Sequence, residues 1–340
     1  MSSASSVSTI NHQVRLAARP SGRPTPADWA FTGEAVPEPG PGQFVVEVSH
    51  LSIDPAMRGW MNAGASYIPP VEVGAVMRAG AVGLVTASEH AGFAVGEAVY
   101  GPFGVQEYAR SDGRGVVKID TSVADPATYL GALGMPGLTA YFGLLDVGRI
   151  KAGDTVVVSG AGGAVGSVAG QIAKIKGCRV VGIAGGDDKV DFIVNELGFD
   201  GGFNYKTTDN YIAKLKELCP NGIDCYFDNV GGAITDAVFP LLNLYARVSV
   251  CGQISQYNLA KPEPGPRLLT YILVKQARVE GFIVIRWMDR WSEGIVQMAQ
   301  WLREGHIKYR EDIVHGFENI PTAFIAMLNG KNTGKMLIQA

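Results

Sequence analysis

From Asp154 onward, short runs of β-branched residues alternate with amphipathic segments of helical length. The β-branched runs are apolar throughout, which is typical of parallel strands buried on both faces of a sheet. The first helical segment, from about Ala164 to Lys176, follows the first run directly. Six strands are expected, within TVVVSG (155–160), CRVVGIAG (178–185), FNY (203–205), DCYFDNV (224–230), ARVSVCG (246–252) and RVEGFIVI (278–285). This order predicts an α/β fold with a doubly wound parallel sheet of the Rossmann type.

The first 130 or so residues have a different pattern, because proline and glycine clusters separate short β-rich runs. QFVVEVSHLSI (43–53) and AGAVGLVTAS (79–88) predict strands. The end of the chain, 322–340, predicts a helix, a turn and one last strand. We therefore expect a β-rich domain over 1–131 and 310–340, and a Rossmann-type α/β domain over 132–309.

Composition narrows the class of protein. The 340 residues carry a formal net charge of −3 and contain no polybasic block, so neither nucleic acid nor a membrane surface is expected as a partner. The start, MSSASSVST, lacks the basic and apolar regions of a signal peptide. Four scattered cysteines in apolar segments predict free thiols. We expect a cytoplasmic enzyme or binding protein.

Glycines crowd the junction between the first predicted strand and its helix. Gly160, Gly163 and Gly166 follow one another at intervals of three, which differs from the common GxGxxG spacing. A glycine-rich turn at a helix N-terminus lets backbone N–H groups approach a pyrophosphate. The alternative is a tight turn that only packs closely, but the six-strand context favours dinucleotide binding.

The end of the second predicted strand indicates which dinucleotide. Gly185 and Gly186 stand where NAD-binding proteins place an acidic residue for the ribose 2′-hydroxyl. Small residues leave room for a 2′-phosphate, and Lys189 would supply its countercharge. Alternatively, Asp188 could simply cap the next helix, and the charge of Lys189 could lie in solvent. The residues favour NADP over NAD.

Several motifs together resemble those of one family: GMPGLTAYFGLLDVG (134–148), GAVG (163–166), FNYK (203–206), DNVGG (228–232), CGQISQYN (251–258) and NTGK (332–335). The chain resembles the zinc-independent medium-chain reductases, in the prostaglandin reductase, leukotriene B4 12-hydroxydehydrogenase and curcumin reductase group. This resemblance implies a GroES-like barrel for the β-rich domain and a homodimer joined near RVEGFIVI. It also implies NADPH-dependent reduction of the C=C bond in α,β-unsaturated ketones and aldehydes.

The resemblance also implies cofactor contacts, with Lys189 and Tyr205 at the 2′-phosphate. The full set is Met135, Thr139, Gly163, Ala164, Val165, Gly166, Lys189, Tyr205, Asn229, Cys251, Gly252, Gln253, Ile254, Ser255, Tyr257, Phe282, Ile283, Val284 and Asn332. Taken singly, Asn229 and Asn332 could be turn residues, and Phe282 to Val284 could be a core strand.

The first domain departs from the zinc-dependent relatives of this family. It has SIDPAMRG (52–59) and VGAVMRAG (73–80) in place of the cysteine and Gly-His-Glu ligands, and no cysteine occurs in the first 177 residues. His12, His50 and His90 lack ligand spacing, so no metal is expected. Ala56 stands where the related group often has tyrosine, which suggests a reshaped or wider substrate pocket.

Without a metal, a neutral hydroxyl is the natural group to stabilise the enolate oxygen. Tyr257 is the candidate catalytic residue, although it could be a packing aromatic at a loop end. Arg58 and Tyr67 are expected in loops of the first domain that face a cleft between the two domains. These two residues and Tyr271 are the candidate substrate contacts. The alternatives are an NADPH quinone reductase and a non-catalytic NADPH-binding protein, which would not need Tyr257.

Overall fold

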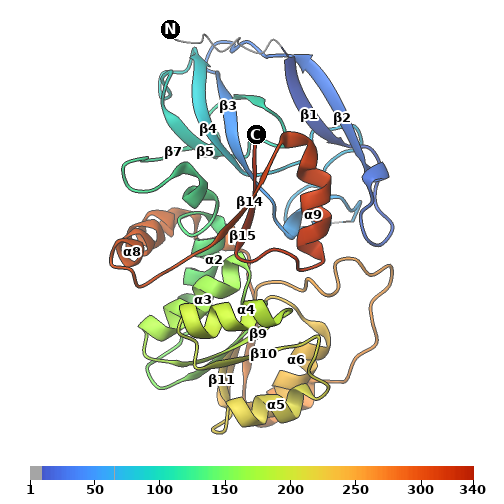
Figure 1. The fold of residues 1–340 in the computed structure, drawn as a ribbon, viewed down its shortest axis with the longest axis vertical. Coiled ribbons are helices and arrows are strands. Elements are labelled where there is room, and N and C mark those ends of the chain that lie inside the picture. The colour runs from blue at the N-terminus through green and yellow to red at the C-terminus, as the bar shows by residue number, and fades with distance from the viewer. Residues whose placement is uncertain (1–9, 65) are drawn as a thin grey trace. The chain divides into compact units, whose positions relative to one another are not determined.

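The computed structural model describes residues 10–64 and 66–340, which divide into two compact units (Figure 1). The first unit contains the described residues up to Leu130 together with 313–329 and 336–340. The second contains 131–312 and 330–335.

The second unit is built on a six-stranded sheet in the order β10-β9-β8-β11-β12-β13. Neighbouring strands run parallel throughout. Val156, Val157 and Val158 are consecutive and fully buried, as expected for a strand covered on both faces. The order is that of the Rossmann fold, so the predicted α/β class and doubly wound sheet are confirmed. The strands are β8 (Thr155–Ser159), β9 (Arg179–Ala184), β10 (Gly201–Asn204), β11 (Ile223–Asp228), β12 (Leu242–Val250) and β13 (Arg278–Gly281).

Helices connect these strands. The amphipathic α3 follows β8 and buries Val168 and Ile172, as its sequence pattern predicts. The helices of this unit are α2 (Met135–Phe142), α3 (Ala164–Ile175), α4 (Asp187–Asp191), α5 (Tyr211–Leu218), α6 (Gly232–Val238), α7 (Leu269–Lys275) and α8 (Trp291–Arg303).

The first unit is β-rich, as predicted. A pair of antiparallel strands, β1 (Ile10–Leu16) and β2 (Trp29–Ala35), accompanies a seven-stranded sheet in the order β14-β15-β3-β4-β5-β7, with β6 paired to β3. The sheet strands are β3 (Phe44–Ser52), β4 (Ala81–Ser88), β5 (Ala98–Gly101), β6 (Tyr108–Ser111), β7 (Val117–Lys118), β14 (Glu311–His315) and β15 (Lys335–Gln339). The helices of this part are α1 (Ala56–Trp60) and α9 (Ile320–Leu328).

The last strand of the parallel sheet is shorter than predicted. β13 ends at Gly281, and a 3-10 helix begins at Val284, so the expected strand over 278–285 is wrong in its second half. The neighbouring strand β12 ends at Val250, whose carbonyl accepts a last hydrogen bond from the Phe282 N–H at 3.3 Å. Burial still alternates beyond that point, with Phe282 buried and Ile283 exposed. The alternation of a turn therefore imitates that of a strand.

The buried carboxylate of Asp228 holds the carboxyl ends of β8 and β11 together. Asp228 is 0% exposed and ends a strand that also carries Asp224 near its start and buries its last four residues, Cys225 to Asp228. Its oxygens accept hydrogen bonds from the hydroxyls of Ser159 at 3.1 Å, Tyr226 at 2.9 Å and Thr235 at 2.7 Å. These donors come from β8, β11 and α6, so one side chain fixes three elements of the unit.

The same carboxylate shapes the two loops that follow β11 and β12. It accepts from the backbone N–H groups of Val230 at 3.0 Å and Gly231 at 2.9 Å, and from the Gln253 side-chain amide at 3.0 Å. Burial, together with the negative charge of Asp228, raises the pKa of Tyr226 well above its ordinary value, so that phenol remains a donor. A buried charge is tolerated here because it is surrounded by donors.

We expect Asp228→Ala to destabilise the protein strongly. Each buried donor left without an acceptor costs about 1–3 kcal/mol, so the free energy of unfolding should fall by about 3 kcal/mol or more. Asp209→Ala, at an exposed position, is the control and should change it by less than about 0.5 kcal/mol. Urea unfolding measures both values, and equal stability of the two variants would contradict this role of Asp228.

Candidate active site

The glycine turn after β8 brings backbone close to backbone at the start of α3. The Gly160 carbonyl accepts a hydrogen bond from the Gly163 N–H at 3.0 Å. A Cβ added to Gly166 would lie 2.3 Å from the Gly160 carbonyl oxygen, so this turn closes only with glycine at 166. Gly163, Ala164 and Val165 are partly exposed at the N-terminus of α3. Because the first N–H groups of a helix have no partner within it, this surface suits an anion.

The turn after β11 lies directly against the glycine turn. The Asn229 side-chain amide donates to the Ser159 carbonyl at 2.7 Å, and its backbone N–H donates to the Ser159 hydroxyl at 2.9 Å. A Cβ added to Gly160, which has a φ of +62°, would lie 3.4 Å from the Asn229 Cβ. Asn229 therefore fastens two strand ends together while remaining partly exposed.

Backbone hydrogen bonds hold the loop 251–257 against the turn after β11. Gly252 donates its N–H to the Asp228 carbonyl at 3.0 Å, and Ser255 donates to the Val230 carbonyl at 3.1 Å. The Tyr257 hydroxyl oxygen accepts from the Gln253 N–H at 3.1 Å and lies 3.2 Å from where a Cβ of Gly252 would be. The phenol is therefore fixed over the backbone of its own loop. Burial raises the pKa of the Cys251 thiol to about 12, so Cys251 is protonated near neutral pH.

Lys189 lies on the other side of the glycine turn. It is 8% exposed, and its ammonium donates to the Gly330 carbonyl at 2.7 Å. A Cβ on Gly162 would come within 3.1 Å of the Lys189 Cβ, so that glycine makes room for the lysine side chain. Burial lowers the pKa of Lys189 below its ordinary value of 10.5. The Tyr205 ring covers Gly185, where an added Cβ would meet the ring at 2.8 Å.

The segment 330–335 joins the glycine turn from the end of the chain. The Gly334 N–H donates to the Gly162 carbonyl at 2.8 Å, and the Asn332 side-chain amide donates to the Gly334 carbonyl at 2.8 Å. Asn332 is thereby held close to the turn, although about 170 residues separate the two segments in the sequence. The structure thus gathers Gly163, Asn229, Lys189 and Asn332 around one turn.

Met135 and Thr139 lie one turn apart on α2, and the Thr139 hydroxyl donates to the Met135 carbonyl at 2.7 Å. Both are partly exposed, whereas their helical neighbours are buried.

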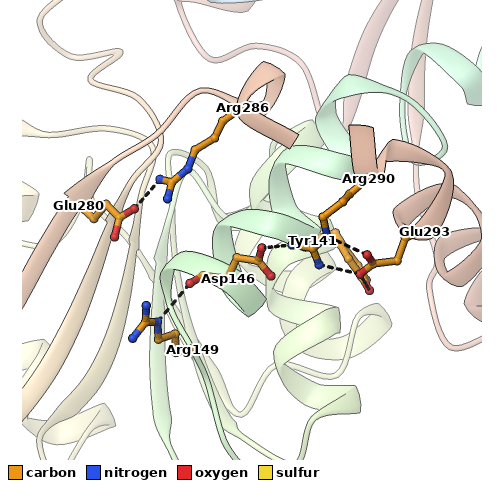
Figure 2. A network of polar contacts seen from close by, with 7 residues as sticks. All are labelled: Tyr141, Asp146, Arg149, Glu280, Arg286, Arg290 and Glu293. Atoms are coloured by element: carbon orange, nitrogen blue, oxygen red, sulfur yellow. Dashed lines mark hydrogen bonds and ion pairs between the residues drawn. The ribbon is translucent and has the colours of Figure 1, made fainter. Parts of the chain in front are cut away.

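A polar network fixes the far end of this helix (Figure 2). Arg290 pairs with Asp146 at 2.5 Å and with Glu293 at 2.9 Å, and the Tyr141 hydroxyl donates to Glu293 at 3.3 Å. In the same view, Arg286 pairs with Glu280 at 2.6 Å.

The remaining predicted residues are placed differently. Phe282 and Val284 are buried, with the Phe282 ring packed on Phe227, whereas Ile283 is exposed. Tyr271 lies on α7 with 37% of its surface exposed. Their assignment to cofactor or substrate contact stays a prediction.

Arg58 and Tyr67 belong to the first unit. The expected loop position of Arg58 is wrong, because a helical turn starts after Pro55 and Arg58 lies in α1. Arg58 is 3% exposed, and its guanidinium donates to the Gly22 carbonyl at 2.7 Å and to Asn62 at 2.6 Å. Tyr67 is 46% exposed, and its hydroxyl accepts from the Trp60 ring N–H at 2.9 Å.

Sequence reasoning missed two groups that organise this site. Asp228 had a signal, since a carboxylate that follows the apolar run Cys225 to Phe227 must be paired or exposed. The Gly330 carbonyl had none, because a backbone acceptor leaves no trace in side-chain patterns.

Within the described ranges, no cluster of three His, Cys, Asp or Glu side chains could hold a metal ion. No helix in the part of the chain that the structure describes is long and apolar enough to cross a membrane.

The arrangement fits a phosphorylated dinucleotide. A Cβ at Gly166 would meet the Gly160 carbonyl oxygen at 2.3 Å, so glycine there lets the turn close against the N-terminus of α3, whose first N–H groups suit a pyrophosphate. Gly185 and Gly186 themselves carry no side chain at the end of β9, the Asp188 carboxylate lies against Gly186, and Lys189 lies next to the glycine turn. The residues present therefore fit NADP.

Comparison with known proteins also indicates an NADP-dependent oxidoreductase. Family models described as the N-terminal domain of oxidoreductase and as zinc-binding dehydrogenase match residues 12–119 and 164–301. The putative NADP-dependent oxidoreductase YfmJ of Bacillus subtilis is 49% identical over 96% of this chain and 97% of its own length. The NADPH-dependent curcumin reductase of Escherichia coli is 45% identical, with 97% and 96% covered.

A solved structure agrees closely in fold. CurA from Vibrio vulnificus in complex with NADPH superimposes with a TM-score of 0.93 at 46% identity, covering 97% of this chain and 99% of that one. Similarity of this extent includes both units and the whole of the candidate site. The chain belongs to the zinc-independent medium-chain dehydrogenases/reductases, in the group of curcumin reductase and prostaglandin reductase.

Proposed function

We propose that this protein is an NADPH-dependent reductase of the C=C bond of α,β-unsaturated ketones and aldehydes. The proposal is supported above all by hydrogen bonds that link the Tyr257 loop, through Gln253, Asp228 and Asn229, to the end of β8 from which the glycine turn begins. Relatives named as curcumin reductase and prostaglandin reductase support the same class of reaction.

The cofactor is NADPH. When bound, it supplies the hydride that reduces the substrate. Gly163 to Gly166 would hold its pyrophosphate, and Lys189 with Tyr205 its 2′-phosphate. We assign the loop 251–257, with Asn229 and Asn332, to the nicotinamide half, and Met135 and Thr139 to the nicotinamide itself. Phe282 to Val284 are further proposed contacts. Arg58, Tyr67 and Tyr271 are further proposed substrate contacts.

Tyr257 would donate a hydrogen bond to the carbonyl oxygen of the substrate. Negative charge grows on that oxygen as the β-carbon is reduced, and a fixed neutral donor stabilises it without reorganisation. The Gln253 N–H holds the phenol oxygen in place beforehand, so little entropy is lost when the substrate binds.

We propose that the protein is a homodimer in the cytoplasm. β13 is an edge strand of the parallel sheet, and Val279, Ile283 and Ile285 on and after it are exposed. An apolar edge strand is usually covered, and a second copy paired along β13 would do so. The buried free thiols of Cys178, Cys219 and Cys225 support a reducing compartment.

Turnover of a simple enone tests the proposed activity. Purified protein with 4-phenyl-3-buten-2-one should consume NADPH rapidly and NADH weakly, as followed by absorbance at 340 nm. The product should be the saturated ketone. Binding of NADPH without turnover of any enone would contradict the proposal, and turnover of quinones alone would replace it with a quinone reductase.

Tyr257→Phe should lower kcat by about 100-fold or more, since one transition-state donor is worth roughly that factor. The dissociation constant of NADPH should remain within about twofold, because the ring and the loop are kept. Tyr245→Phe, at an exposed position on β12, is the matched control. A wild-type rate in the Tyr257 variant would rule out its role as the donor.

NADPH binding should weaken as pH rises through the lowered pKa of Lys189. The protonated ammonium binds the phosphate, so the contribution is complete below that pKa and is lost above it, at a pH below the ordinary lysine value of 10.5. The KM for NADPH should therefore rise between neutral pH and about pH 10, while that for NADH stays level. Parallel rises for both cofactors would contradict the assignment.

Val279→Lys should convert the dimer to a monomer, because a charge would be buried where two edge strands meet. Sedimentation measures the change, and Val296→Lys on the exposed face of α8 is the control. A wild-type protein that sediments as a monomer would refute the dimer directly.

A further inference from the structure

Lys206 lies next to the segment that carries Lys189. Asn204, the last residue of β10, is in register with Ala184, the last residue of β9. The Tyr205 N–H donates to the Ala184 carbonyl at 3.0 Å, so the two strand ends stay paired up to that point. The chain leaves β9 through Gly185 toward Lys189, and leaves β10 through Tyr205 toward Lys206.

The turn that presents Lys206 is fixed by hydrogen bonds. The Lys206 N–H donates to the Asn204 side-chain oxygen at 3.0 Å, and the Asn204 amide donates to Asp187 in α4 at 2.9 Å. Asn204 is only 8% exposed. The Tyr211 hydroxyl donates to the Tyr205 carbonyl at 2.8 Å. The backbone of Lys206 is therefore tied to the helix from which Lys189 extends.

The Lys189 ammonium lies within the electrostatic influence of Lys206. Burial lowers the pKa of Lys189, Lys206 lowers it further, and Asp188 and Asp312 oppose both effects. The Lys189 ammonium donates to a neutral acceptor, the Gly330 carbonyl. The exposed Lys206 side chain makes no hydrogen bond or ion pair with residues 10–64 and 66–340.

Two neighbouring cations without a carboxylate bonded to either ammonium favour an anion between them. At this surface the Tyr205 ring covers Gly185, and the Asp188 carboxylate lies against Gly186, where an added Cβ would meet its Oδ1 at 2.3 Å. A phosphate monoester carries a charge of about −1.5 to −2 at neutral pH, which one lysine does not neutralise. A second cation is therefore worth most when the ligand is a dianion.

We propose that Lys206 is a second cationic ligand of the ribose 2′-phosphate of NADPH and that, with Lys189, it sets the preference for NADPH over NADH. This inference rests on the proposed function only in its choice of cofactor. Lys206 contributes a charge at the solvent-facing side of the phosphate, whereas Lys189 contributes a buried one.

Binding measurements on the full protein test the assignment. In Lys206→Gln, the dissociation constants of NADPH and 2′,5′-ADP should rise about 5- to 30-fold, as expected for loss of one charge-assisted hydrogen bond at an exposed site. Those of NADH and 5′-AMP should stay within about twofold. Lys206→Arg should retain most of the NADPH affinity.

Lys216→Gln, at an exposed position on α5, is the matched control and should leave all four ligands unaffected. Unchanged NADPH binding in Lys206→Gln, or equal weakening of NADPH and NADH, would overturn the proposal. The proposed reaction is judged separately: wild-type protein that binds NADPH but reduces no enone would refute the activity, while selective weakening in Lys206→Gln would still support this inference.

Discussion

The candidate site depends on one buried negative charge. Asp228 ends β11 with a fully buried carboxylate, and its donors come from β8, α6, and the loops after β11 and β12. A carboxylate in an apolar sheet is stable only when donors surround it, so the loops that supply those donors have little freedom. The loop with Tyr257 and the turn with Asn229 are therefore rigid parts of the Rossmann unit.

The opposite side of the glycine turn has the reverse charge. Lys189 lies there, and its buried ammonium donates to a neutral backbone carbonyl, that of Gly330. The chain end, through Gly330 and Gly334, is bonded to the same turn. One side of the turn is thus completed by internal hydrogen bonds, while the other keeps positive charge for a ligand. This asymmetry explains how the same turn can be both rigid and ready to bind a phosphorylated dinucleotide.

Much of the fold and part of the site could be predicted from the sequence. The apolar strands and the glycine spacing follow from local chemistry, so the six-stranded sheet and the turn at Gly163 were predictable. The end of β13 was not, because it is set by where β12 ends rather than by its own residues. Arg58 was expected in a loop, yet it is buried in a helix. Its guanidinium is hydrogen-bonded to the Gly22 carbonyl, 36 residues away in the sequence. The Gly330 carbonyl is a backbone group and leaves no sequence signal.

The proposed reaction is reduction of a C=C bond with hydride from NADPH. The most direct measurement uses NADPH deuterated at C4 on the transferred face, with 4-phenyl-3-buten-2-one as substrate and NMR analysis of the product. The expected product is 4-phenylbutan-2-one with deuterium on the former β-carbon. Deuterium on the carbonyl carbon of an allylic alcohol would show reduction of the C=O bond and would contradict it.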